Sequence, residues 1–93
     1  MNTAAPQAEE EVIDQIRTQE PAKVILFNDE IHTFDEVISQ LIKAINCNHS
    51  QAEAYALEVH TKGRACVFGG DMPKCLEVSA VLEEIQLMTH IEF

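Results

Sequence analysis

The apolar positions of the chain change their spacing several times, and each change marks an expected element. Residues 24–27 (VILF) form a short apolar run that ends at Asn28-Asp29, a pair typical of turns, so this run is predicted to be a buried strand. From residue 34 onward, apolar residues recur at i, i+3, i+4, i+7, i+8 and i+11, which predicts a helix with one continuous inner stripe. The stripe consists of Phe34, Val37, Ile38, Leu41, Ile42 and Ile45.

Polar residues at the expected helix ends support these assignments. Thr33 and Glu36 have the spacing of a capping box, in which each side chain satisfies a free backbone donor at the start of the first helix. Ser50 and Glu53 have the same spacing and are predicted to open a second helix, which ends at Gly63.

The rest of the chain predicts a strand, a helix and a final strand. Residues 64–68 are the second strand, which Gly69-Gly70 is expected to break. Asp71 is positioned to cap a third helix that tolerates Pro73 in its first turn, and residues 87–91 form the last strand. The order β-α-α-β-α-β predicts an α+β fold, with three helices packed on one side of a small antiparallel three-stranded sheet.

Composition separates a tail from the domain. Residues 1–20 contain Ala, Pro and Gln together with the run Glu9-Glu10-Glu11, which predicts a flexible acidic N-terminal tail before a single domain over residues 21–93. The net charge of −10 argues against nucleic acid or an anionic membrane as the main partner, because both require basic surfaces.

The chain also lacks an apolar run long enough to span a bilayer, and its N-terminus does not have the pattern of a secretory signal. Cys47, Cys66 and Cys75 are odd in number and show no CxxC spacing. They are typical of reduced thiols, which favours a cytoplasmic protein.

The polar residues give no sign of metal or enzyme chemistry. Residues 28–30 (NDE) alone are typical of a solvated turn, and a histidine such as His60 near a helix end often interacts only with the helix dipole. No cofactor, metal site or catalytic activity is therefore predicted, since there is no nucleophile elbow, phosphate loop or recognised zinc spacing. The residues of zinc-ligand type are Cys47, His49, His60, Cys66, Cys75 and His90.

Two stretches taken together resemble the ClpS family of N-degron adaptors. They are residues 23–30 (KVILFNDE) and 59–65 (VHTKGRA), and the resemblance extends over about residues 23–92. It implies the same α+β fold and a non-enzymatic adaptor. Such an adaptor binds the free N-terminal residue of a substrate, bulky hydrophobic or aromatic, and delivers the substrate to a ClpA- or ClpC-like AAA+ ATPase-protease.

The resemblance also implies roles for individual residues. Asn28 and His60, assisted by Asp29, are expected to hold the α-amino group of the substrate, and an ammonium with three donors does require acceptors of these kinds. An apolar pocket for the first side chain is expected beside them, and Lys74 matches an ATPase-docking lysine loosely. The pocket positions are Ile31, Phe34, Val37, Ala56, Val59 and Leu87.

Three departures from the family pattern leave alternatives open. Residues 32–34 (HTF) stand where Thr-Pro-Met is common, Ala56 stands where Met is common, and the segment from Gly63 to Leu87 is shorter than usual. Phe34, Val37 and Val59 could also be plain core residues. The chain could instead be a ClpS-fold protein that docks on the ATPase as a regulator without N-degron recognition, or a small metal- or redox-responsive protein.

Overall fold

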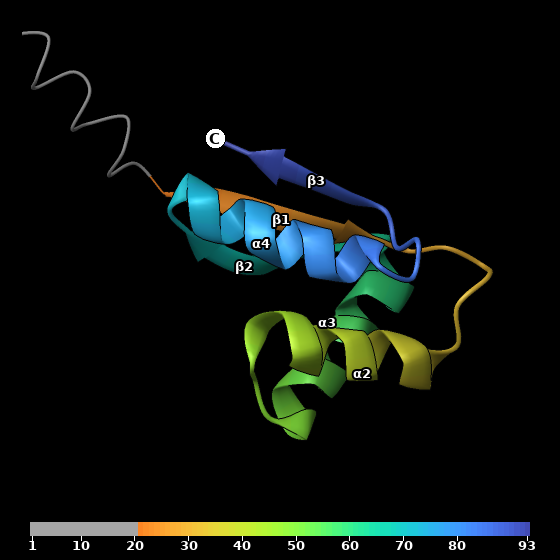
Figure 1. Ribbon diagram of the computed structural model, residues 1–93. Helices are drawn as coiled ribbons and strands as arrows, with labels where there is room; N and C mark the ends of the chain where they lie inside the picture. The colour runs from red at the N-terminus through yellow and green to blue at the C-terminus, as the bar shows by residue number, and fades with distance from the viewer. Residues whose placement is uncertain (1–20) are drawn as a thin grey trace, which may run out of the picture.

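A computed structural model describes residues 21–93 (Figure 1). Its elements are β1 (Ala22–Phe27), α2 (Phe34–Ile45), α3 (His49–Lys62), β2 (Arg64–Gly70), α4 (Met72–Glu83) and β3 (Thr89–Glu92). The predicted order of elements and the α+β class are confirmed. The predicted tail, residues 1–20, lies outside the described residues.

The sheet has β1 at its centre, between β2 and β3, and both pairings are antiparallel. Leu26 pairs with Ala65 of β2 and with Thr89 of β3. Because the central strand is covered by neighbours on both edges and by helices, Val24 and Leu26 are fully buried. The end of β1 therefore has a fixed position, and it carries the residues that follow it to a defined place.

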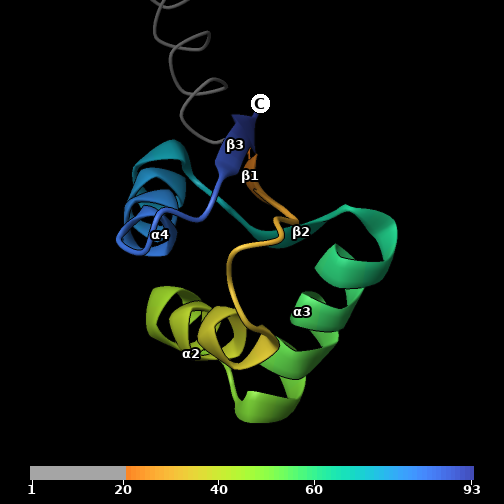
Figure 2. The same ribbon diagram turned by 90° about the vertical axis from the view of Figure 1, so that its right-hand side faces the viewer.

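The three helices share one core with the inner face of the sheet. Figure 1 shows α4 running along the sheet with α2 and α3 below it, and Figure 2 shows the same arrangement from the side. Apolar side chains from all three helices join one buried cluster, which removes apolar surface from water and stabilises the fold. Its largest fully buried side chains include Leu26, Leu41, Leu82, Val24 and Val67.

The starts of the helices agree with the sequence at two places and differ at one. Thr33 accepts a hydrogen bond from the amide of Glu36, as predicted, and Asp71 accepts one from the amide of Lys74. The predicted box of Ser50 with Glu53 is wrong. Asn48 is the N-cap of α3, with its side chain 2.8 Å from the amide of Gln51, and Ser50 lies inside the first turn.

Strand boundaries also differ from the prediction, and β1 begins at Ala22 rather than at Val24. β2 continues through Gly69 and Gly70, which pair with Lys23 and Ala22, because glycine retains both backbone groups that a sheet requires. β3 begins at Thr89 rather than at Leu87, which is buried in the turn before the strand.

Candidate functional site

The turn after β1 and the end of α3 are held together by the backbone. Gly63 ends α3 with φ 89°, in the left-handed region that glycine adopts at little cost. The chain thereby turns back toward the sheet, and the carbonyl of Gly63 accepts a hydrogen bond of 2.9 Å from the amide of Asn28. His60 lies one helical turn earlier, so this bond brings Asn28 and His60 to the same place.

Asp29 organises the turn itself. One carboxylate oxygen accepts hydrogen bonds of 2.9 Å from the amides of both Ile31 and His32. Burial tends to raise the pKa of Asp29, but these amides and the His32 ring together hold that pKa below its usual value. A carboxylate has about four acceptor positions, and three are already used, so most of its capacity is spent on holding the turn.

His32 extends this arrangement to a distant part of the chain. Its Nδ1 lies 2.7 Å from the second carboxylate oxygen of Asp29, and its Nε2 bonds to the carbonyl oxygen of Ile85, which follows α4. The carboxylate of Asp29 and the carbonyl of Ile85 raise the pKa of His32 against the effect of burial. The sequence analysis did not assign His32 to the site. The Asp-x-x-His spacing in a turn was the one available signal, whereas the contact with Ile85 depends on the tertiary fold.

A hollow of about 440 Å³, here called the turn hollow, opens between this turn, α2 and α3. Its polar lining comes from Asn28, Asp29, Glu30, His32 and His60, and its apolar lining from Phe34, Val37, Ala56 and Val59. A smaller inner hollow of about 20 Å³ shares five of these residues and adds Leu26, Phe27 and Leu87. One hollow thus combines hydrogen-bond acceptors with an apolar wall, which is the composition of a small-ligand site.

The structure brings together most of the expected site residues. Asn28, Asp29 and His60 all line the turn hollow, and four of the six expected apolar residues line it with them. Leu87 is 3% exposed and lines only the inner hollow. Ile31 is 84% exposed and is outside both linings.

Comparisons with known proteins show the family of the chain. Residues 17–90 match the family described as ATP-dependent Clp protease adaptor protein ClpS. The chain belongs to the ClpS adaptor family. The ClpS adaptor of Wolinella succinogenes is 40% identical over 58 residues, which cover 60% of this chain and 57% of that protein.

Two further ClpS-related similarities extend the comparison. Human E3 ubiquitin-protein ligase UBR2 is 34% identical over 70 residues, which are 75% of this chain but 4% of the ligase. A solved structure of Agrobacterium tumefaciens ClpS2 bound to L-phenylalaninamide shares the fold, with a TM-score of 0.69 and 20% identity. That match covers 80% of this chain and 96% of the ClpS2 chain.

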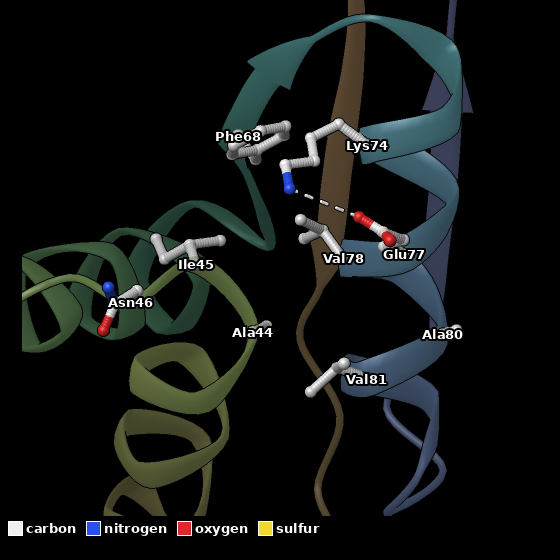
Figure 3. A pocket seen from close by; sticks show the side chains of 9 residues that line it. All are labelled: Ala44, Ile45, Asn46, Phe68, Lys74, Glu77, Val78, Ala80 and Val81. Atoms are coloured by element: carbon white, nitrogen blue, oxygen red, sulfur yellow. Dashed lines mark ion pairs between the residues drawn. The ribbon is translucent and has the colours of Figure 1, made fainter.

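A second, larger depression of about 530 Å³ lies at the other end of α2 from the turn hollow of this ClpS chain. We call it the α2–α4 groove; Figure 3 shows Phe68 and Lys74 near one end, with Val78 and Val81 pointing from α4 toward the end of α2. The ammonium of Lys74 lies 3.4 Å from the carboxylate of Glu77, and both side chains are exposed. The groove and the turn hollow share no lining residue. The full lining is Ala44, Ile45, Asn46, Phe68, Lys74, Glu77, Val78, Ala80 and Val81.

Other chemistry has little support within residues 21–93. No group of three or more His, Cys, Asp or Glu side chains in this range could hold a metal ion. Cys47, Cys66 and Cys75 are all free thiols, and burial raises the pKa of Cys75. None of the described helices is both long enough and apolar enough to cross a membrane.

Proposed function

We propose that this chain is a non-enzymatic adaptor that binds the free N-terminal residue of substrate proteins. The preferred residue is bulky and hydrophobic or aromatic. The adaptor then delivers the bound substrate to a Clp-family AAA+ ATPase of the ClpA or ClpC type in the cytoplasm. Membership of the Clp protease adaptor family supports the general role, and the composition of the turn hollow supports the kind of ligand.

The observation that carries the proposal is that Asn28 and His60 line the same hollow, whose wall is partly apolar. An α-ammonium group offers three donors, and the Asn28 carbonyl oxygen and a neutral His60 nitrogen are acceptors. Hydrogen bonds to a charged group contribute about 1.5–3 kcal/mol each, so two of them distinguish a free N-terminus from an internal amide by a large factor. Asp29 contributes negative charge and holds the turn.

The apolar part of the hollow is suited to the first side chain of the ligand. Val37 and Val59 form its inner wall, and burial of a Leu or Phe side chain contributes about 1.5–3 kcal/mol. The relative from Agrobacterium tumefaciens is described with L-phenylalaninamide bound, a ligand that combines an α-amino group with an aromatic side chain. We propose a ligand of the same chemistry for the turn hollow.

Two residues are expected to set the preference among bulky side chains. Ala56, which is buried in the wall of the hollow, leaves space that a longer side chain would fill. Phe34 is 40% exposed and lines the hollow with a flat ring, which favours edge-to-face or stacked contact with an aromatic ligand by about 0.5–1.5 kcal/mol. We therefore expect Phe, Tyr and Trp to bind better than Leu, and Ile and Val to be admitted.

We further propose the α2–α4 groove as the surface that docks on the ATPase. Its floor is apolar and Lys74 gives it an exposed cation, the combination found at many protein interfaces. The two ends of the 12-residue helix α2 are roughly 17 Å apart along its axis, at about 1.5 Å per residue. The separation allows the adaptor to hold a substrate and the ATPase at once.

Fluorescence polarisation with labelled peptides that differ only in residue one tests the proposed ligand. Phe, Tyr and Trp peptides are expected to bind roughly 10- to 100-fold more tightly than a Gly peptide, from the burial of one large apolar side chain. Equal affinity for all first residues would contradict the proposal. If the chain then still bound the ATPase, the regulator without N-degron recognition would be the better account.

A further inference from the structure

The ring of His32 lies between two hydrogen-bond acceptors from different parts of the chain. Nδ1 is 2.7 Å from the Asp29 carboxylate, in the turn after β1. Nε2 bonds to the carbonyl oxygen of Ile85, which is 53 positions further along and follows the end of α4. The His32 side chain is 9% exposed and that of Asp29 is 23% exposed, so both bonds are partly shielded from water.

The chemistry of the two acceptors fixes the protonation of the ring. An ionised carboxylate and a peptide carbonyl only accept hydrogen bonds, and a neutral imidazole has a single N–H to donate. A neutral ring would therefore direct a lone pair at one of the two oxygens. The imidazolium, with two N–H groups, satisfies both, and its charge is compensated by Asp29.

We propose that His32 is a positioning residue that works as a doubly hydrogen-bonded imidazolium and fixes the amine-binding turn against the end of α4. This inference rests on the function proposed above, because the turn that His32 holds is the one that carries Asn28. The ring also lines both the turn hollow and the inner hollow. Loss of its charge releases one of the two bonds and lets the turn shift relative to His60.

This arrangement predicts an alkaline limit to recognition. Asp29 on the turn and Glu36 on α2 favour the charged ring, the α4 side presents the Ile85 carbonyl, and His60 lines the same hollow from α3. The pKa of His32 is raised, so the imidazolium is present at lower pH and is lost as the pH rises through that pKa. Ligand binding then weakens at alkaline pH because a residue of the protein, His32, loses its proton.

Nitrogen-15 NMR of the histidine rings tests the protonation state without any ligand. Two-bond nitrogen–proton correlation spectra of the labelled full chain at neutral pH are expected to show both ring nitrogens of His32 protonated. A neutral-tautomer pattern for His32 at neutral pH would overturn the proposal. Because no peptide is present, this result is independent of whether the chain binds N-degrons.

Peptide affinity as a function of pH tests the positioning role. The ligand amine itself titrates with a pKa of about 7.7–8.0, which also changes affinity with pH. We therefore compare the dissociation constants of the variant His32→Gln and the natural chain as a ratio. The titration of the ligand amine affects both constants equally and cancels in this ratio. We expect the variant to bind a Phe peptide roughly fivefold more weakly at slightly acidic pH, since the turn is held less firmly while the ligand-binding side chain of Asn28 is retained. The ratio should approach one at alkaline pH.

A ratio that stays constant with pH would show a merely structural role and overturn the proposal. His90→Gln makes the same chemical change at an exposed residue of β3 and should leave the ratio at one throughout. If the natural chain bound no peptide at any pH, the proposed function would fail. The ring spectrum of the natural chain would then still decide whether His32 is the imidazolium.

Discussion

The turn hollow and the α2–α4 groove lie at opposite ends of α2 and are built in different ways. In the turn hollow, hydrogen bonds fix the Asp29 carboxylate against the His32 ring and the Asn28 backbone against that of Gly63. In the groove, apolar side chains dominate and the Lys74–Glu77 ion pair is exposed. Acceptors carried on a fixed turn select one chemical group, whereas an apolar floor with exposed charges provides contact area. The difference favours ligand recognition at the first site and docking at the second.

The sharpest way to break this comparison is to remove an acceptor from the turn hollow. Asn28→Ala or His60→Ala should weaken binding of a Phe peptide at least about tenfold, because one hydrogen bond to a charged group exceeds 1.4 kcal/mol. Titration by fluorescence polarisation measures the change. His49→Ala, at an exposed position of α3, is the matched control and should bind like the natural chain. Normal affinity in both site variants would show that the amine-binding site does not lie in this hollow.

Acidification should weaken the same hydrogen bond without any mutation. His60 must be neutral to accept from the ligand ammonium, and a protonated ring would repel that cation. A protonated His60 should therefore lower peptide affinity by about tenfold, the loss expected for His60→Ala, and the variant His60→Ala should lose this dependence. A binding curve that stayed flat across mildly acidic pH would show that His60 is not the acceptor.

A smaller effect is expected from filling the wall of the turn hollow. Ala56→Met should narrow the space beside Phe34 and lower the affinity for Trp peptides relative to Leu peptides by roughly fivefold, within the cost of overpacking. Ala54→Met places the same side chain on the exposed face of α3 and should not alter the ratio. Unchanged binding of Ile and Val peptides in Ala56→Met would mean that Ala56 does not set the preference.

The smallest effect is expected at the α2–α4 groove. Lys74→Glu should weaken binding to the ATPase by about threefold, because exposed ion pairs contribute only about 0.2–1 kcal/mol, and should leave peptide affinity unchanged. Lys23→Glu changes the same charge on β1, outside the groove, and is the control. Pull-down or interferometry with a ClpA- or ClpC-type ATPase measures docking. A loss of peptide binding in Lys74→Glu would contradict the independence of the two sites.

Sequence reasoning was strongest where local chemistry decides the structure. The order of elements, the Thr33 capping box and the left-handed Gly63 all follow from residues that lie within a few positions of each other. The start of α3 was misjudged because Asn48 and Ser50 are both good caps two positions apart, and the bond to Gln51 decides between them. Boundaries of this kind depend on small differences in free energy.

The site was accessible from the sequence only in part. Residues 23–30 and 59–65 resemble one family, and this resemblance pointed to Asn28 and His60 as partners. Both residues line one hollow in the structure. The role of His32 could not be predicted, because its second acceptor belongs to Ile85 and is brought there by the packing of α4. The exposure of Ile31 likewise follows from the turn that the Asp29 hydrogen bonds hold, and hydrophobic periodicity does not predict it.

The most direct test of the central claim compares one Phe peptide with a free N-terminus and with an acetylated N-terminus. Acetylation removes the charge and leaves an amide with a single donor, while the apolar side chain stays the same. Acetylation is expected to weaken binding at least about 100-fold, because two charged hydrogen bonds at the turn hollow are lost. Equal affinity for the two peptides would contradict the central claim, because the hollow would then recognise apolar surface and not a free N-terminus.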